Sequence, residues 1–197
     1  VLHNHAHGNL LKETDLVLLD AGAERRSGYC ADVTRTWPVN GHFSPEAREV
    51  YDIVLAAEQA AIAAVKPGVR YRDIHMLAAR VLTDGLVQMK LMKGNPAELV
   101  ADGAHAMFFP HGVGHLIGLD VHDMEAFGDQ VGYAPGRLRS EQFGTAYLRL
   151  DLDLEPGMCV TIEPGIYFVP AILHDAAFRK RFRGRVDFAR AESFLTM

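Results

Sequence analysis

The stretch TDLVLLDAGAERRSGYCADVTRTWPV, residues 14–39, decides how this chain folds. Its first part, residues 14–24, is a short apolar run ending in aspartate, alanine and glycine, which is typical of a buried strand that stops at a turn. Residues 29–39 are rich in β-branched and aromatic side chains, which favour a second strand. The intervening RRSG is a turn, so the stretch predicts an antiparallel hairpin.

Two helices are predicted directly after this hairpin. Ser44 suits an N-cap and Pro45 suits the first helical position, so we expect a helix that stops before Pro67. A second helix is expected from about Tyr71 to Met92. Strands, then two consecutive helices, then further strands indicate an α+β fold, with the helices on one face of a largely antiparallel sheet.

The second half of the chain gives weaker signals. We expect a weak helix near residues 97–105, a long loop over 128–150 and an irregular insert over 170–185. Residues 154–168 predict a turn followed by a strand that ends at Glu163. The length of 197 residues suits one domain or two small halves.

The composition excludes several classes of function. The net charge of −5 and the pI near 6.0 leave no electrostatic footprint for nucleic acid, and the basic run at 178–185 favours a solvated loop. No apolar run reaches the ~18 residues that a membrane span needs. The two cysteines, Cys30 and Cys159, form no CxxC motif and no disulfide framework, so we expect a cytoplasmic protein.

Three carboxylates stand at the ends of predicted strands or within them. Asp20 ends the first strand, Asp32 lies in the second, and Glu163 ends the run CVTIEPG. An acid inside a strand is costly to bury unless it is paired or bound to a metal. If the two strands pair, Asp20 and Asp32 could face each other. Turn capping, or pairing with Arg35, is the simpler interpretation of each aspartate taken alone.

Histidines gather in the segment FFPHGVGHLIGLDVHD, residues 108–123. His111 and His115 have the HxxxH spacing that zinc proteases carry on a helix. Gly112 stands where those proteases need a glutamate, however, and the glycines oppose a helix. An extended segment is the better interpretation, with His115 as a metal ligand and His111 and His122 nearby. Three hydrogen-bonded structural histidines are the alternative.

The carboxylates and one imidazole together predict a metal site. Hard oxygen donors with a single histidine suit Mn²⁺, Co²⁺ or Zn²⁺ better than a metal that prefers thiolates. A carboxylate-rich cluster typically holds two ions, which activate water and polarise a carbonyl. We therefore expect two divalent ions, with Mn²⁺ favoured.

Three blocks of the sequence resemble one known family. The blocks LLDAGAE…GYCADVTRTWPVNGHF, FFPHGVGHLIGLDVHD and LEPGMCVTIEPGIYF are similar to the metallopeptidases of the creatinase/methionine aminopeptidase group. Within that group they most resemble the Xaa-Pro peptidases, prolidase and aminopeptidase P. The resemblance implies the pita-bread fold, a curved and largely antiparallel sheet with helices packed on its outer face. It also implies a single catalytic domain, 1–197, with pseudo-twofold halves at about 1–95 and 96–197.

The resemblance implies roles for individual residues as well. His111 and His122 would lie beside the metals and contact the substrate, and a histidine would stabilise the oxyanion. His3 would line the site. A hydroxide that bridges the metals would attack the scissile carbonyl, with Glu163 moving the proton. The four implied metal ligands are Asp20, Asp32, His115 and Glu163.

The family's fifth ligand is not found in this sequence. It is a second glutamate in a late Gly-Gly-x-Arg-x-Glu strand, and Glu192, the only late glutamate, lacks that context. The resemblance thus implies a catalytic domain cut at both ends, without the family's N-terminal domain and last strand. Because four ligands would compensate the carboxylate repulsion less well, we expect weak metal binding and low activity. Calorimetric metal titration tests this expectation.

The activity implied by the resemblance is hydrolysis of Xaa-Pro peptide bonds. A prolidase-like dipeptidase is favoured because a long insert follows EPGIYF. The alternatives are removal of an N-terminal residue before proline, as by aminopeptidase P, and an inactive pita-bread binding module that lacks the fifth ligand. The expected partners are a proline-containing peptide and, in the intact protein, a second copy in a homodimer. Neither nucleic acid nor a membrane is expected.

Overall fold

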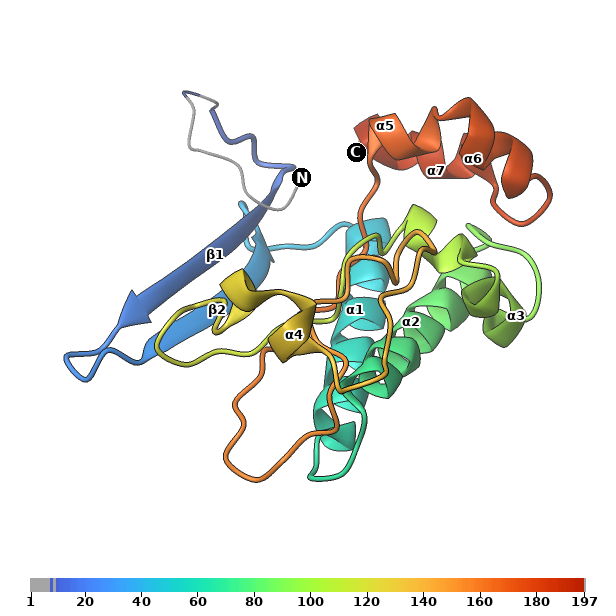
Figure 1. The fold of residues 1–197 in the computed structure, drawn as a ribbon. Coiled ribbons are helices and arrows are strands. Elements are labelled where there is room, and N and C mark those ends of the chain that lie inside the picture. Colours follow the sequence, from blue (N-terminus) through green and yellow to red (C-terminus); the bar gives the residue numbers. More distant parts are fainter. Residues whose placement is uncertain (1–7, 9, 197) are drawn as a thin grey trace.

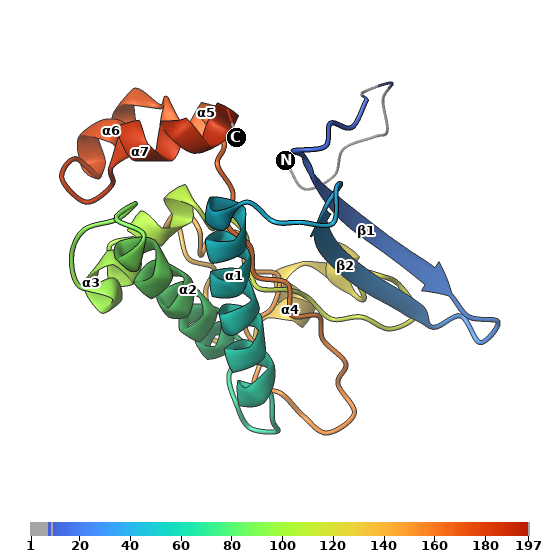
Figure 2. The same ribbon diagram turned by 180° about the vertical axis from the view of Figure 1, so that it is seen from behind.

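The computed structural model describes residue 8 and residues 10–196, which form a hairpin, two long helices and several short helices (Figure 1). β1 (Leu16–Glu24) and β2 (Cys30–Pro38) pair antiparallel, which confirms the predicted hairpin. Within the described part of the chain these two strands are the whole of the sheet. The sheet is therefore smaller than expected. Figures 1 and 2 show it extending away from the two long helices rather than lying beneath them.

The register of the hairpin puts two aspartates on one face. Asp20 lies opposite Thr34, and Gly22 lies opposite Asp32. Because cross-strand partners share a face and side chains alternate along a strand, Asp20 and Asp32 are diagonal neighbours. A Cβ on Gly22 would stand 2.3 Å from the carbonyl oxygen of Ala31. The pairing that brings the aspartates together therefore needs glycine at this position.

The two long helices follow the hairpin, as predicted. They are α1 (Pro45–Ala64) and α2 (Tyr71–Gln88). The hydroxyl of Ser44 caps α1 by accepting a hydrogen bond from the main-chain N–H of Ala47 at 3.1 Å. This satisfies one of the amides that a helix start leaves without an intrahelical acceptor.

α1 and α2 pack closely, and small side chains make this possible. A Cβ on Gly85 of α2 would come within 2.5 Å of the Ile53 side chain on α1. α2 ends earlier than the predicted Met92 because Lys90 has a φ of 61°, in the left-handed region that a helix cannot continue through. The fully buried alanines of this helix pair are Ala57, Ala61, Ala78 and Ala79.

The histidine segment is extended, as predicted, and it lies antiparallel to the segment that carries Glu163. The main-chain N–H of Thr161 donates to the carbonyl of His115 at 2.9 Å, and that of Glu163 donates to the carbonyl of Val113 at 2.7 Å. The predicted strand ending at Glu163 was nevertheless wrong, because only the pair Leu116–Val160 meets the pattern of a β-bridge. Pro164 follows at once and cannot donate to a ladder.

Short helices replace the irregular regions that the sequence predicted. The weak helix near 97–105 is present as two short pieces, and both the expected loop at 128–150 and the insert at 170–185 contain helical turns. No helix in the described residues is long and apolar enough to cross a membrane. The short helices are α3 (Pro96–Ala101), η1 (Ala104–Met107), η2 (Glu125–Phe127), α4 (Asp129–Gly132), α5 (Pro170–Leu173), α6 (Ala176–Arg181), α7 (Phe188–Ser193) and η3 (Phe194–Thr196).

Candidate metal centre

Three side chains from distant parts of the chain meet at one point. Asp32 lies on β2, His115 lies on the extended histidine segment, and Glu163 lies on the segment paired with it. The Nε2 atom of His115 is 3.3 Å from Oδ2 of Asp32 and 3.2 Å from Oε1 of Glu163. One donor atom from each of the three lies within 4.8 Å of the others. Over residues 10–196, this is the one group of three such donors.

The ring of His115 is oriented by its own backbone. Its Nδ1 atom is 2.8 Å from the carbonyl oxygen of Leu116, which can only accept, so Nδ1 carries the proton. Nε2 therefore points toward Asp32 and Glu163 and, in the metal-free protein, carries the proton that hydrogen-bonds Glu163. Without that proton, Nε2 would present its lone pair at this point, as a metal-ligating imidazole does. Burial lowers the pKa of His115, but the hydrogen bond to Glu163 and the two carboxylate charges outweigh it and raise the pKa.

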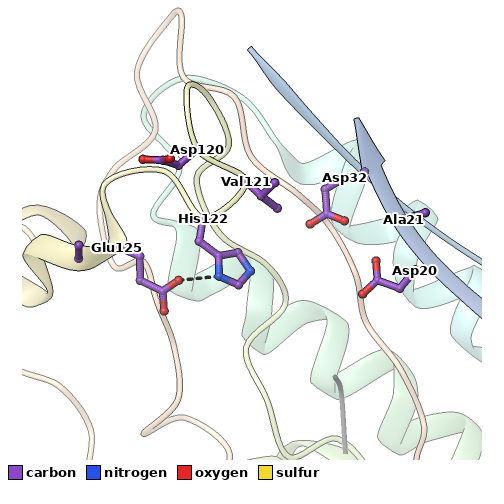
Figure 3. Close-up of a pocket in the computed structure, with 9 residues that line it drawn as sticks. Asp20, Ala21, Asp32, Asp120, Val121, His122 and Glu125 are labelled. Atoms are coloured by element: carbon purple, nitrogen blue, oxygen red, sulfur yellow. Dashed lines mark ion pairs between the residues drawn. The ribbon is translucent and has the colours of Figure 1, made fainter. Parts of the chain in front are cut away.

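Asp20 stands beside this cluster on the neighbouring strand. Figure 3 shows its carboxylate and that of Asp32 turned into the same space. The hydroxyl of Thr34 donates to Oδ1 of Asp20 at 3.0 Å, which fixes the side chain across the hairpin. Burial raises the pKa of Asp32, and the negative charges of Asp20 and Glu163 raise it further. The carboxylates therefore repel one another where they converge.

Glu163 remains a carboxylate in spite of its burial. Burial raises its pKa, but hydrogen bonds from His115 and from the hydroxyl of Thr161 outweigh this and lower it. The hydroxyl of Thr161 donates to Oε1 of Glu163 at 2.8 Å. An oxygen ligand is thus kept charged in a half-buried place.

His122 faces the cluster from the loop that follows the histidine segment. Its ring centroid is 4.3 Å from that of His115. Its Nδ1 atom lies 2.9 Å from Oε2 of Glu125 (Figure 3). The same atom lies 2.9 Å from the guanidinium NH1 of Arg149. Burial and the positive charge of Arg149 lower the pKa of His122. Arg149 can only donate, so in that contact Nδ1 accepts and a neutral ring carries its proton on Nε2, while the charge of Glu125 opposes the lowering of the pKa.

His111 lies deeper than the other predicted site histidines. Its Nδ1 atom is 2.7 Å from the carbonyl oxygen of Gly112, and its ring packs edge-on against Phe109 and Tyr167. Burial lowers its pKa, although the charge of Glu163 opposes this. His111 therefore acts on the cluster through its interaction with Glu163, from outside the group of three donors.

Glu192, which lacks the family's motif context, lies away from the three donors. His3 lies outside the residues that the structure describes. Glu192 lies on α7, where Oε1 is 2.5 Å from NH1 of Arg179 and 3.7 Å from Nε2 of His174. Figure 1 shows α7 among the C-terminal helices, well away from the hairpin. The described structure therefore gives Glu192 a structural ion pair and not a place among the donors.

The donor set fits a hard divalent cation. Two of its three members are carboxylates, the third is an imidazole whose Nε2 atom points inward, and a further carboxylate, Asp20, stands alongside. The mutual repulsion of Asp20, Asp32 and Glu163, seen in the raised pKa of Asp32, is what a cation would relieve.

Sequence reasoning missed three residues that shape this site. They are Thr161, which hydrogen-bonds Glu163, and the pair Glu125 and Arg149, which flank His122. The sequence did carry a signal for Arg149. Residues 148–154, LRLDLDL, alternate apolar and polar side chains, which is typical of a strand with one solvent-exposed face, and Arg149 is one of the polar positions. Thr161 carries no signal of its own, because its role depends on the segment opposite.

Two pockets open beside the donors. One of about 640 Å³ is lined by Asp20, Asp32, His122 and Glu125, among others. The second is lined by His115, Glu125 and Arg149. Pockets of a few hundred cubic ångström suit small ligands. Glu125 lines both pockets.

An α+β fold that brings carboxylates and one imidazole together beside open pockets fits the class of metal-binding proteins. The chain belongs to metallopeptidase family M24, whose sequence profile matches residues 1–189. It is 44% identical over 157 residues to a probable Xaa-Pro aminopeptidase of Paracoccidioides lutzii, covering 80% of this chain and 32% of that protein. The chain thus spans about a third of the length of this relative.

Solved structures give the same picture. Aminopeptidase PepP of Pseudomonas aeruginosa superimposes with a TM-score of 0.70 at 38% identity, covering 93% of this chain and 37% of that one. Zn-substituted aminopeptidase P of Escherichia coli in complex with product gives a TM-score of 0.67 at 38% identity, covering 88% and 34%. The predicted pita-bread fold is therefore confirmed. The division into halves near residue 95 stays a prediction.

Proposed function

We propose that this chain is the metal-binding catalytic part of a peptidase that hydrolyses the bond between a residue and a following proline. The observation that carries the proposal is the convergence of Asp32, His115 and Glu163, with Nε2 of His115 turned toward both carboxylates. The names of the similar proteins, Xaa-Pro aminopeptidases, support the substrate class.

The residues proposed to hold the metal are Asp20, Asp32, His115 and Glu163, with two Mn²⁺ ions as the favoured occupants. Such ions supply water activation and polarisation of the scissile carbonyl. The oxygen-rich donor set supports a hard cation of this kind over a thiolate-binding one. Glu163, which its hydrogen bonds keep ionised, is also proposed to move the proton during hydrolysis.

His122 is proposed to donate a hydrogen bond to the carbonyl oxygen as negative charge develops there. Arg149 donates to its Nδ1 atom, so the proton of the neutral ring sits on Nε2. A donor fixed before the reaction stabilises an oxyanion without reorganisation. His111 is proposed to assist from the inner wall, where its ring packs on Tyr167.

Among Xaa-Pro substrates we favour dipeptides, and Arg149 is the reason. It lines the pocket next to His115, and its side chain is about one-third exposed although it already pairs with Glu125. A free C-terminal carboxylate directly after the scissile bond would meet this cation, whereas a longer peptide places an amide there. The second candidate, removal of an N-terminal residue from longer peptides, is favoured by the names of the relatives.

The test is Mn²⁺-dependent hydrolysis of matched peptides by the 197-residue chain. We expect release of proline from Ala-Pro, slower cleavage of Ala-Pro-Ala, and no cleavage of Ala-Ala. Asp32→Asn should lower the rate by at least ~100-fold, while Asp52→Asn, which alters an exposed ion pair on α1, should leave it unchanged. Preferred cleavage of Ala-Pro-Ala would favour the second candidate. An Mn²⁺-independent rate, or no cleavage of either Xaa-Pro peptide, would contradict the proposal.

A further inference from the structure

We propose that Thr161 is a positioning residue whose hydroxyl sets the Glu163 carboxylate for metal binding. This inference rests on the metal site of the proposed function. The hydroxyl oxygen of Thr161 accepts a hydrogen bond from the main-chain N–H of His115 at 3.0 Å and lies 2.8 Å from Oε1 of Glu163. It thus links two of the three donors, one through its backbone and one through its carboxylate.

The direction of these two hydrogen bonds is fixed by chemistry. The amide of His115 can only donate, so it uses a lone pair of the hydroxyl. The hydroxyl's own proton is then directed to Glu163, whose ionised carboxylate can only accept. One Oε atom of Glu163 is thereby held between the Thr161 hydroxyl and Nε2 of His115, 3.2 Å away.

Thr161 is itself held on two sides. Its main-chain N–H donates to the carbonyl of His115 at 2.9 Å. Its carbonyl accepts from the hydroxyl of Tyr71 at 2.7 Å, and Tyr71, at the start of α2, is fully buried. A β-branched side chain on a fixed backbone has few χ1 choices. The hydroxyl is therefore placed by the helix layer and not by the metal.

Gly114, the residue before His115, makes the contact between His115 and Thr161 possible. Gly114 has a φ of +155°, and a Cβ there would stand 2.2 Å from the carbonyl oxygen of Thr161 and 2.5 Å from the hydroxyl of Tyr71. Only a residue without a side chain lets the histidine segment approach this closely. The glycine in GVGH thus serves the contact between His115 and Thr161.

The consequence is a carboxylate ordered before any ion arrives. A glutamate side chain loses rotamer freedom when it is fixed, and here the fold has already restricted it. Partners that orient first ligands in this way typically contribute about 10- to 100-fold to metal affinity. Thr161 should therefore act on metal affinity without touching the ion.

The test compares Thr161→Val with Thr161→Ser in the 197-residue chain, using Mn²⁺ alone as the probe in isothermal titration calorimetry. Valine keeps the shape and removes the hydroxyl, so the dissociation constant should rise about 10- to 100-fold. Serine keeps the hydroxyl and should bind within about threefold of the parent chain. Thr83→Val is the matched control, because this buried hydroxyl donates to Ala79 within α2, and its Mn²⁺ affinity should not change.

The outcomes separate this inference from the proposed function. Far-ultraviolet circular dichroism of each metal-free variant checks that valine has not unfolded the chain. Parental Mn²⁺ affinity in folded Thr161→Val, equal losses in the valine and serine variants, or no Mn²⁺ binding by the parent chain would each overturn the role of Thr161. If the predicted ranking of affinities holds while no Xaa-Pro peptide is cleaved, the inference stands and the proposed function fails.

Discussion

At the scale of single residues, two buried histidines make the stability of this protein depend on pH. Burial lowers the pKa of His75 to about 3, with His105, His111 and Arg72 adding repulsion. Burial also lowers the pKa of His105 to about 4. Both rings therefore stay neutral in the fold, whereas an unfolded chain protonates them near pH 6.5.

The expected result is a loss of stability as pH falls from about 6.5 toward 4, because there the unfolded state binds protons that the folded state does not. Each histidine contributes up to about 1.4 kcal/mol per pH unit in that window. Urea unfolding at pH 7, 6 and 5 measures it. His75→Leu should flatten the dependence, whereas His42→Leu, on an exposed loop, should keep it. An unchanged slope in His75→Leu would contradict this prediction.

Asp32 should lower the stability of the metal-free protein while being needed to bind the metal. Its raised pKa means that ionisation is opposed in the fold, so its charge destabilises the metal-free protein above its folded pKa. Asp32→Asn should raise the free energy of unfolding of the metal-free chain at pH 7 by about 0.5 to 1 kcal/mol. Denaturant unfolding with a chelator present measures this gain. Calorimetry should show that Mn²⁺ binding is lost, and a destabilised metal-free variant would refute the prediction.

At the scale of elements, the crossing of α1 and α2 depends on one glycine. Gly85→Ala would normally stabilise a helix interior by about 1 kcal/mol. Here the new methyl group meets several atoms of Ile53 at less than 3.0 Å. We therefore expect a net loss of about 1 to 3 kcal/mol by thermal unfolding. Adding Ile53→Ala should recover part of the lost stability. A Gly85→Ala variant more stable than the parent would show that the two helices move apart to accommodate the methyl group.

The elements that could be predicted from sequence are those with strong local signals. The hairpin follows from an apolar run, a glycine turn and a β-branched return strand, and α1 follows from its Ser-Pro start. The strand before Glu163 failed because it depends on a partner: its hydrogen bonds go to residues far away in the sequence. The end of α2 was missed because nothing in the sequence marks the left-handed Lys90.

The site shows the same division between local and distant signals. The carboxylates and histidines could be identified from the sequence as candidate metal ligands. The structure brings three of them, Asp32, His115 and Glu163, together. Thr161, which orients Glu163, could not be identified from the sequence, because its hydrogen-bond partners are set by tertiary packing. Sequence therefore indicates which atoms are available and leaves their orientation to the fold.

At the scale of the whole molecule, a bound ion would add a link between the hairpin and the segments that carry His115 and Glu163. The hairpin projects from the helices (Figure 2), and Asp32 reaches from it to His115 and Glu163. Mn²⁺ at about a hundredfold excess over its dissociation constant should raise the free energy of unfolding by about 2.7 kcal/mol. Differential scanning calorimetry with and without chelator measures this. His115→Ala should abolish the effect, and an equal gain in that variant would show that the ion binds elsewhere.

The wide separation of the three donors along the chain also has a kinetic meaning. Segments around residues 32, 115 and 163 must all dock before the cluster exists, so it should be absent from the folding transition state. An ion that binds only the finished cluster slows the escape from the native state and leaves the rate of reaching it unchanged. Stopped-flow mixing should therefore show that Mn²⁺ lowers the unfolding rates and leaves the folding rates unchanged. A faster folding rate would mean that the ion helps to nucleate the fold.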